Sequence, residues 1–114
     1  YRLDQLLRPD AIDGMDTAAR LVVEQLRAGG RFLVCGDYDA DGATALTIVV
    51  RALRGFGARD VHWRVPNRFR HGYGLTPELV AELAELAPAL LITVDHGTAS
   101  VAGVAAANAA GFRV

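Results

Sequence analysis

Three short apolar runs alternate with segments of helical length along this chain, and that alternation limits the fold more than any other feature. The runs are residues 31–36 (RFLVCG), 60–66 (DVHWRVP) and 89–95 (ALLITVD). Each is too short for a helix and rich in residues that favour strands. The alternation predicts an α/β fold: a doubly wound, Rossmann-like parallel sheet with helices on both faces.

Helix signals fill the intervals between these runs. Helices are expected over residues 16–29, 44–57, 76–86 and 101–110, with Thr76 and Ser100 as N-caps of the last two. Residues 1–30 form a leading helical segment. The ending GFRV, residues 111–114, is similar to the start of another buried strand, so we expect the chain to be a fragment of a larger domain.

Composition fits one modest globular unit without a membrane span. The chain has 114 residues, 52% of them hydrophobic, and no run approaches the roughly 18 apolar residues that a spanning helix requires. Its net charge is −1, so only local clusters of charge can indicate nucleic-acid binding. Its single cysteine, Cys35, lies within an apolar run and is expected to be a core residue. We expect a cytoplasmic protein.

Carboxylates follow two of the three predicted strands. Asp37, Asp39 and Asp41 occupy alternate positions after the first strand, and Asp95 ends the third. Ligands of open α/β sheets gather beyond the carboxyl ends of the strands, so these side chains are expected to meet in one crevice. Carboxylates held close together raise one another's pKa or recruit a cation. Because carboxylate oxygens suit Mg²⁺ and Mn²⁺, the pattern predicts a metal site.

These aspartates allow three other interpretations. Isolated aspartates after strands usually serve as turn or cap residues, but four at two strand ends exceed that need. An EF-hand loop would require an acidic residue where Ile48 stands, and a helix in place of the first strand. A haloacid-dehalogenase-like phosphatase would use Asp39 as nucleophile and Asp41 as acid/base partner. That family also uses a lysine, which this chain lacks. The phosphatase is nevertheless kept as an alternative function.

A second cluster, in the loop after the second strand, is basic and aromatic. Arginine side chains match phosphate oxygens, aromatic rings stack on unpaired bases, and glycines let a ligand approach the backbone. His62, on a strand, is expected to be structural, whereas His96 beside Asp95 has candidate roles in metal or substrate contact and in packing. The expected substrate-binding residues are Arg68, Arg70, His71, Gly72, Tyr73, Gly74 and His96.

Taken in order, three motifs resemble the amino-terminal part of the DHH phosphoesterase superfamily, and most closely its RecJ-like single-stranded-DNA-specific exonucleases. The motifs are GDYDADG (36–42), VPNRFRHGYGL (65–75) and LLITVDHG (90–97). On this resemblance, residues 31–114 are the amino-terminal portion of a DHH domain, truncated before the Asp-His-His motif. Two positions depart from the family pattern: His71 stands where an acidic residue is expected, and His96 where asparagine or cysteine is common.

The resemblance also implies roles for the aspartates. Asp39, Asp41 and Asp95 would be the catalytic residues and metal ligands, with Asp95 bridging and Asp37 as an auxiliary carboxylate. The cofactor would be Mn²⁺ or Mg²⁺ in a two-metal site of the full enzyme. Arg68 and the turn formed by residues 72–74 would face the substrate backbone.

The function that this resemblance implies is metal-dependent 5′-to-3′ exonucleolytic hydrolysis of single-stranded DNA in recombination and repair. The fragment itself is expected to be inactive, because two imidazoles and a second domain would be missing. Besides the phosphatase, the alternatives are another DHH phosphodiesterase, acting on oligonucleotides, cyclic dinucleotides or pyrophosphate, and a non-catalytic metal- or nucleotide-binding module. Oligomeric state and protein partners stay open.

Overall fold

The computed structural model describes Arg2, Gln5 and residues 8–114. Part of the expected leading segment, residues 1, 3, 4, 6 and 7, therefore lies outside the described residues. The elements, in chain order, are η2 (Pro9–Ala11), α1 (Met15–Ala28), β1 (Phe32–Cys35), α2 (Ala40–Gly55), β2 (Val61–Arg64), α3 (Arg68–His71), α4 (Pro77–Ala84), β3 (Leu90–Thr93) and α5 (Val101–Ala109).

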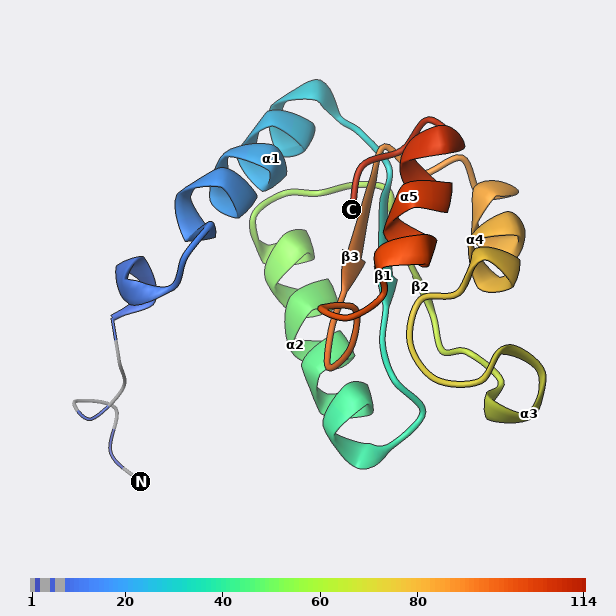
Figure 1. Cartoon of the computed structure of the whole chain (residues 1–114). Coiled ribbons are helices and arrows are strands. Elements are labelled where there is room, and N and C mark those ends of the chain that lie inside the picture. Colours follow the sequence, from blue (N-terminus) through green and yellow to red (C-terminus); the bar gives the residue numbers. More distant parts are fainter. Residues whose placement is uncertain (1, 3–4, 6–7) are drawn as a thin grey trace.

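The three strands form one parallel sheet in the order β2-β1-β3 (Figure 1). In its register Cys35 lies opposite both Arg64 and Thr93, so the three strands end level with one another. On the other side of β3, Arg113 forms an isolated parallel bridge with Leu90, and Leu91 N–H donates to the carbonyl of Arg113 at 2.8 Å. The expected doubly wound parallel sheet is confirmed.

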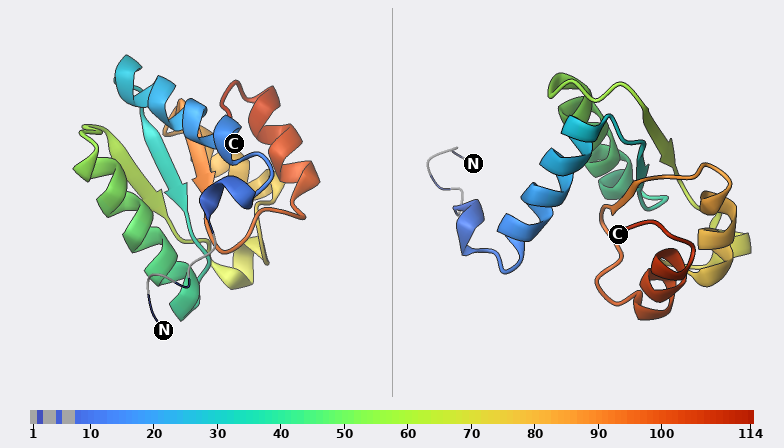
Figure 2. Two further views of the ribbon diagram at one scale, coloured as in Figure 1. Left: turned by 90° about the vertical axis from the view of Figure 1, so that its left-hand side faces the viewer. Right: turned by 90° about the horizontal axis from the view of Figure 1, so that it is seen from above.

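Helices cover both faces of the sheet because successive strand residues point to opposite sides. Leu33, Cys35 and Leu91 pack with buried residues of α4 and α5. Phe32 and Val34 pack with residues of α1 and α2 on the other face. Figures 1 and 2 show the sheet between these two pairs of helices. The central strand β1 has no exposed residue, as its unbroken apolar sequence predicts.

Three local expectations are corrected. Helix α2 begins at Ala40, four residues before the apolar period, because Asp39 caps it by accepting from Gly42 N–H. The expected loop after β2 contains the one-turn helix α3. Ser100 occupies the N-cap position of α5 without capping it, since its Oγ accepts from Leu75 N–H at 3.0 Å.

Other signals are confirmed. Thr76 caps α4 by accepting from Leu79 N–H, and Gly29 ends α1 at a positive φ. His62 lies 2.7 Å from Asp60, which also pairs with Arg31 before β1, at the edge of the sheet opposite to the carboxylates. That arrangement agrees with a structural role for His62. Within the described part of the chain, no helix is both long and apolar enough to cross a membrane.

Candidate metal centre

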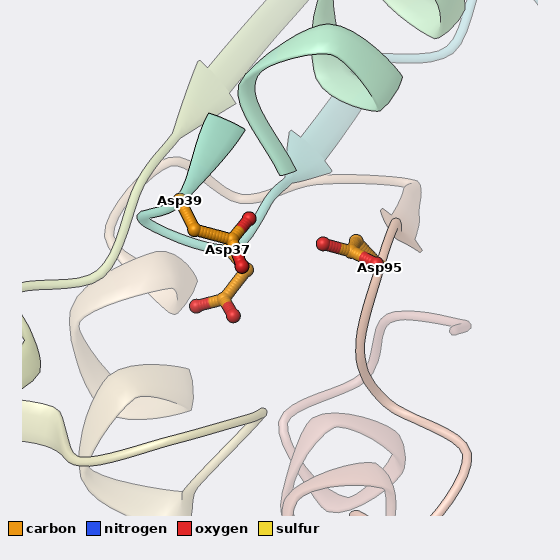
Figure 3. A group of neighbouring side chains, drawn as sticks. All are labelled: Asp37, Asp39 and Asp95. Carbon is orange, nitrogen blue, oxygen red and sulfur yellow. The ribbon is translucent and has the colours of Figure 1, made fainter. Parts of the chain in front are cut away.

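Two loops meet at the carboxyl edge of the sheet and carry the acidic residues. One runs from β1 into α2 and contains Asp37 and Asp39; the other runs from β3 toward α5 and contains Asp95. Because β1 and β3 are neighbours whose last residues are in register, the two loops leave the sheet side by side. Figure 3 shows the Asp95 side chain pointing across the gap toward the other two.

The three carboxylates are close enough to share a cation. Asp37, Asp39 and Asp95 each offer one oxygen, and these three atoms lie within 4.8 Å of one another. Asp37 is buried, whereas Asp39 and Asp95 are exposed, so an ion would reach the group from solvent. Such a set of hard oxygen donors fits Mg²⁺ or Mn²⁺.

Backbone hydrogen bonds fix two of these side chains in place. Asp37 Oδ1 accepts from Tyr38 N–H at 2.8 Å, and Asp39 Oδ1 accepts from Gly42 N–H at 2.9 Å. One oxygen of each carboxylate is therefore bound to the backbone, and a cation needs only the other. The start of α2 also lies close to Asp37, since a Cβ on Gly42 would stand 2.5 Å from the Asp37 carbonyl oxygen.

Asp95 shows the electrostatic effect of the cluster. Loss of hydration raises its pKa, and the charges of Asp39 and Asp41 raise it further. Its backbone adopts a left-handed conformation with φ of 63°, which is uncommon outside glycine. Strain of this kind is typical of functional sites. A cation among the carboxylates would relieve the repulsion that raises this pKa.

Asp41 lies outside the group of three. It stands in the first turn of α2, because that helix begins at Ala40 with Asp39 as its cap. Its charge still contributes to the raised pKa of Asp95. The group that the structure brings together thus includes Asp37, expected as an auxiliary carboxylate, and the metal-binding role of Asp41 stays a proposal.

Cys35, at the end of β1, is a buried core residue, as the sequence predicts, and lies outside the group of three carboxylates. Burial, followed by the charge of Asp37, raises the pKa of the Cys35 thiol to about 12. The thiol therefore stays protonated at neutral pH, and only a thiolate binds metal ions well.

The basic loop contacts the loop between β1 and α2 through Arg68. Its guanidinium carbon lies 5.0 Å from the centroid of the Tyr38 ring, and Tyr38 stands between Asp37 and Asp39 in the chain. A second ring, that of Phe69, is 5.8 Å away. Arg68, an expected substrate-binding residue, therefore contacts the ring of the residue that separates Asp37 from Asp39 in the chain.

Other residues of the loop contact either α4 or the loop after β3. Arg70 and His71 both contact Glu82 on α4, at 2.9 and 3.1 Å. The Tyr73 hydroxyl donates to the carbonyl of Asp95 at 3.4 Å. Gly72 and Gly74 have positive φ values, which turn the chain from α3 back toward α4.

His96 lines a cavity of about 600 Å³ together with Tyr73 and Asp95. Both of its ring nitrogens are buried, and neither has a hydrogen-bond partner among the described residues. Burying a donor or acceptor without a hydrogen-bond partner costs free energy of folding. The His96 ring is therefore suited to bind a group outside the described residues.

Sequence reasoning missed two residues of this region. Tyr38 could have been noticed, because it separates two of the candidate ligands. Glu82 could not, because its contacts with Arg70 and His71 depend on how α4 packs beside α3.

Comparison with known proteins identifies the family. Residues 31–114 match the model of the DHH family, N-terminal domain. The chain belongs to the DHH family. Among curated relatives, the single-stranded-DNA-specific exonuclease RecJ of Dickeya dadantii is 44% identical over 103 residues, 90% of this chain. The RecJ of Thermus thermophilus is 47% identical over 95 residues, 83% of this chain.

Solved structures give the same result. A crystal structure of exonuclease RecJ bound to manganese superposes with a TM-score of 0.71 and 47% identity, covering 81% of this chain and 23% of that one. A crystal structure of Thermus thermophilus RecJ in complex with Mn²⁺ gives a TM-score of 0.76 and 39% identity, covering 96% of this chain and 15% of that one. The chain spans only 18% and 14% of the length of the Dickeya and Thermus relatives.

Proposed function

We propose that this chain is the amino-terminal part of a metal-dependent exonuclease that hydrolyses phosphodiester bonds of single-stranded DNA. The observation that carries the proposal is the meeting of Asp37, Asp39 and Asp95 within 4.8 Å at the ends of two adjacent strands. The RecJ relatives that cover most of the chain support the substrate. The RecJ structures that contain Mn²⁺ support the cofactor, with Mg²⁺ as the other hard cation that fits.

Residues 31–114 would form the first part of the DHH domain, preceded by the leading segment 1–30. Because the chain spans a small share of its relatives, the remaining ligands, including the histidines of the Asp-His-His motif, would come from the rest of the protein. The isolated chain would then be inactive. The proposal includes 5′-to-3′ polarity, a role in recombination and repair, and a cytoplasmic location.

The residues of this chain have distinct tasks in the reaction. Asp39, Asp41 and Asp95 would hold the cations, with Asp37 as an additional carboxylate; Asp41 would act from the first turn of α2. Divalent cations there supply a water of lowered pKa and stabilise charge on the phosphate. Arg68 binds a backbone phosphate beside the cluster, while the exposed Phe69 and Tyr73 offer rings for stacking with unpaired bases.

The test uses the full-length protein that carries this segment. With Mn²⁺, the wild type releases nucleotides from 5′-phosphorylated single-stranded DNA much faster than from duplex DNA. Asp95→Asn keeps the size of the side chain but removes its charge. The rate of nucleotide release falls by a factor of at least about 100, as expected when a ligand of the catalytic metal loses its charge. Faster cleavage of a cyclic dinucleotide, a short oligonucleotide or pyrophosphate than of single-stranded DNA would refute the assigned substrate.

Family membership bears on the other candidates. The match to the DHH model speaks against the haloacid-dehalogenase-like phosphatase. A non-catalytic metal- or nucleotide-binding module would bind Mn²⁺ without turnover of any of these substrates, and the same assay detects that outcome.

A further inference from the structure

The one-turn helix α3 is closed on itself by Asn67. Oδ1 of the Asn67 side chain accepts from Phe69 N–H at 2.9 Å, and the backbone carbonyl of Asn67 accepts from the N–H groups of Arg70 and His71. A helix of four residues has little stability of its own, because the conformational entropy lost in forming the first turn outweighs the hydrogen bonds that one turn makes. The orientation of α3 must therefore be set by contacts with the rest of the protein.

The ring of His71 makes that contact. Only 7% of the His71 side chain is exposed, and both of its nitrogens are used. Nδ1 accepts from Asn67 N–H at 3.1 Å, so in the neutral ring the hydrogen lies on Nε2 and is donated to Glu82 Oε1, also at 3.1 Å. A ring enclosed in this way has no group left to contact a substrate.

Glu82 is a firm anchor because α4 is held in the core. Leu79, Val80 and Leu83 of that helix are at most 3% exposed. The same Glu82 oxygen also pairs with Arg70 at 2.9 Å, so two side chains of α3 converge on one carboxylate. Contacts therefore connect the packed helix α4, through Glu82 and His71, to the turn that carries Arg68.

We propose that His71 is a positioning residue, which holds α3 so that Arg68 lies over the ring of Tyr38, the residue between Asp37 and Asp39. The distances support this chain of contacts: 3.1 Å from His71 to Glu82 and 5.0 Å from the Arg68 guanidinium to the Tyr38 ring. His71 was expected from the sequence to bind substrate, whereas this inference assigns it an action through Arg68. It rests on the proposed function, because Arg68 is taken to bind a phosphate of the DNA.

Kinetics of the full-length protein on single-stranded DNA test the inference. His71→Ala raises KM about tenfold, the order expected when one hydrogen bond to a charged group is misplaced, and leaves kcat within about twofold. His71→Gln restores KM, because a glutamine amide can accept from Asn67 and donate to Glu82. In the Arg68→Ala background, His71→Ala adds little, because the residue it positions is already absent.

Matched variants of α4 provide a second route if His71→Ala does not fold. Glu82→Ala removes the acceptor for His71 and raises KM in the same way, whereas Glu85→Ala, at an exposed residue of the same segment with no described side-chain contact, leaves KM unchanged. Additive effects of His71→Ala and Arg68→Ala would overturn the inference, as would a loss confined to kcat or a normal KM for Glu82→Ala. If the wild type itself does not cleave single-stranded DNA, the proposed function fails instead.

Discussion

Substituting Gly42 with alanine tests how closely α2 is packed against the metal centre. A Cβ at this position would lie 2.5 Å from the Asp37 carbonyl oxygen and 2.7 Å from its carbonyl carbon and amide nitrogen. Real Cβ atoms essentially never approach closer than 3.0 Å, so α2 and Asp37 must separate by at least about 0.5 Å. Both elements carry a member of the carboxylate group, since Asp39 caps α2.

Two free energies follow from that separation. Overpacking of this kind costs about 1–3 kcal/mol, and replacing a helical glycine with alanine returns about 1 kcal/mol, so metal-free stability falls by about 0–2 kcal/mol. Metal binding suffers more, because metal–ligand distances tolerate only about 0.2 Å. We expect Mn²⁺ affinity to fall about 100-fold, the order of effect that misplacing a reacting group by about 1 Å has on a rate.

Urea unfolding of the full-length protein, with EDTA and with Mn²⁺, measures both quantities. At a Mn²⁺ concentration about 100 times the wild-type Kd, the ion stabilises the wild type by about 2.7 kcal/mol, but a variant of about 100-fold lower affinity by only about 0.4 kcal/mol. Gly55→Ala is the matched control at the other end of α2, where a Cβ would meet nothing within 4 Å. Equal Mn²⁺ stabilisation of Gly42→Ala and Gly55→Ala would refute the reasoning.

Three further predictions concern single side chains. Asp95→Asn stabilises the metal-free protein at neutral pH, because loss of hydration and then the charges of Asp39 and Asp41 raise the pKa of Asp95 and disfavour its ionised form. The same substitution abolishes most of the stabilisation by Mn²⁺, and melting curves with and without EDTA check both effects. The hydrogen bond from His71, and then the charge of Arg70, lower the pKa of Glu82, so Glu82 stabilises the fold above its usual pKa and this contribution is lost as pH falls through the lowered value. The difference in unfolding free energy between wild type and Glu82→Gln should shrink over that acid range. Gly103→Ala destabilises by about 1–3 kcal/mol in urea unfolding, because its Cβ would overlap the Leu75 carbonyl.

The sheet could be predicted because its sequence signals are local. The run FLVC has no polar residue, which is how a central parallel strand must read when helices cover both of its faces. The proximity of Asp39 and Asp95 also followed from topology, since neighbouring parallel strands end at one edge. The start of α2 could not be predicted from the spacing of apolar residues. That spacing becomes helical only after Gly42, whereas the N-cap at Asp39 lets the helix begin at Ala40.

That one displacement explains why the observed carboxylate group differs from the expected one. Once Asp39 is the cap, Asp41 is carried into the first helical turn, and Asp37 lies on the other side of the cap at the end of the strand. The contact of His71 with Glu82 was beyond prediction for another reason. It depends on the packing of α4 beside a turn that sequence patterns do not identify as helical.

Asp39 joins the stability of the fold to the assembly of the site. Its Oδ1 caps α2, and an N-cap aspartate contributes about 1 kcal/mol, so the folded chain holds this carboxylate in place before any ion arrives. The positive end of the α2 dipole lies beside the cluster and offsets part of its repulsion. A cation then meets ligands that are already oriented, and the remaining cost of assembly falls on Asp95, whose raised pKa and left-handed backbone reflect it.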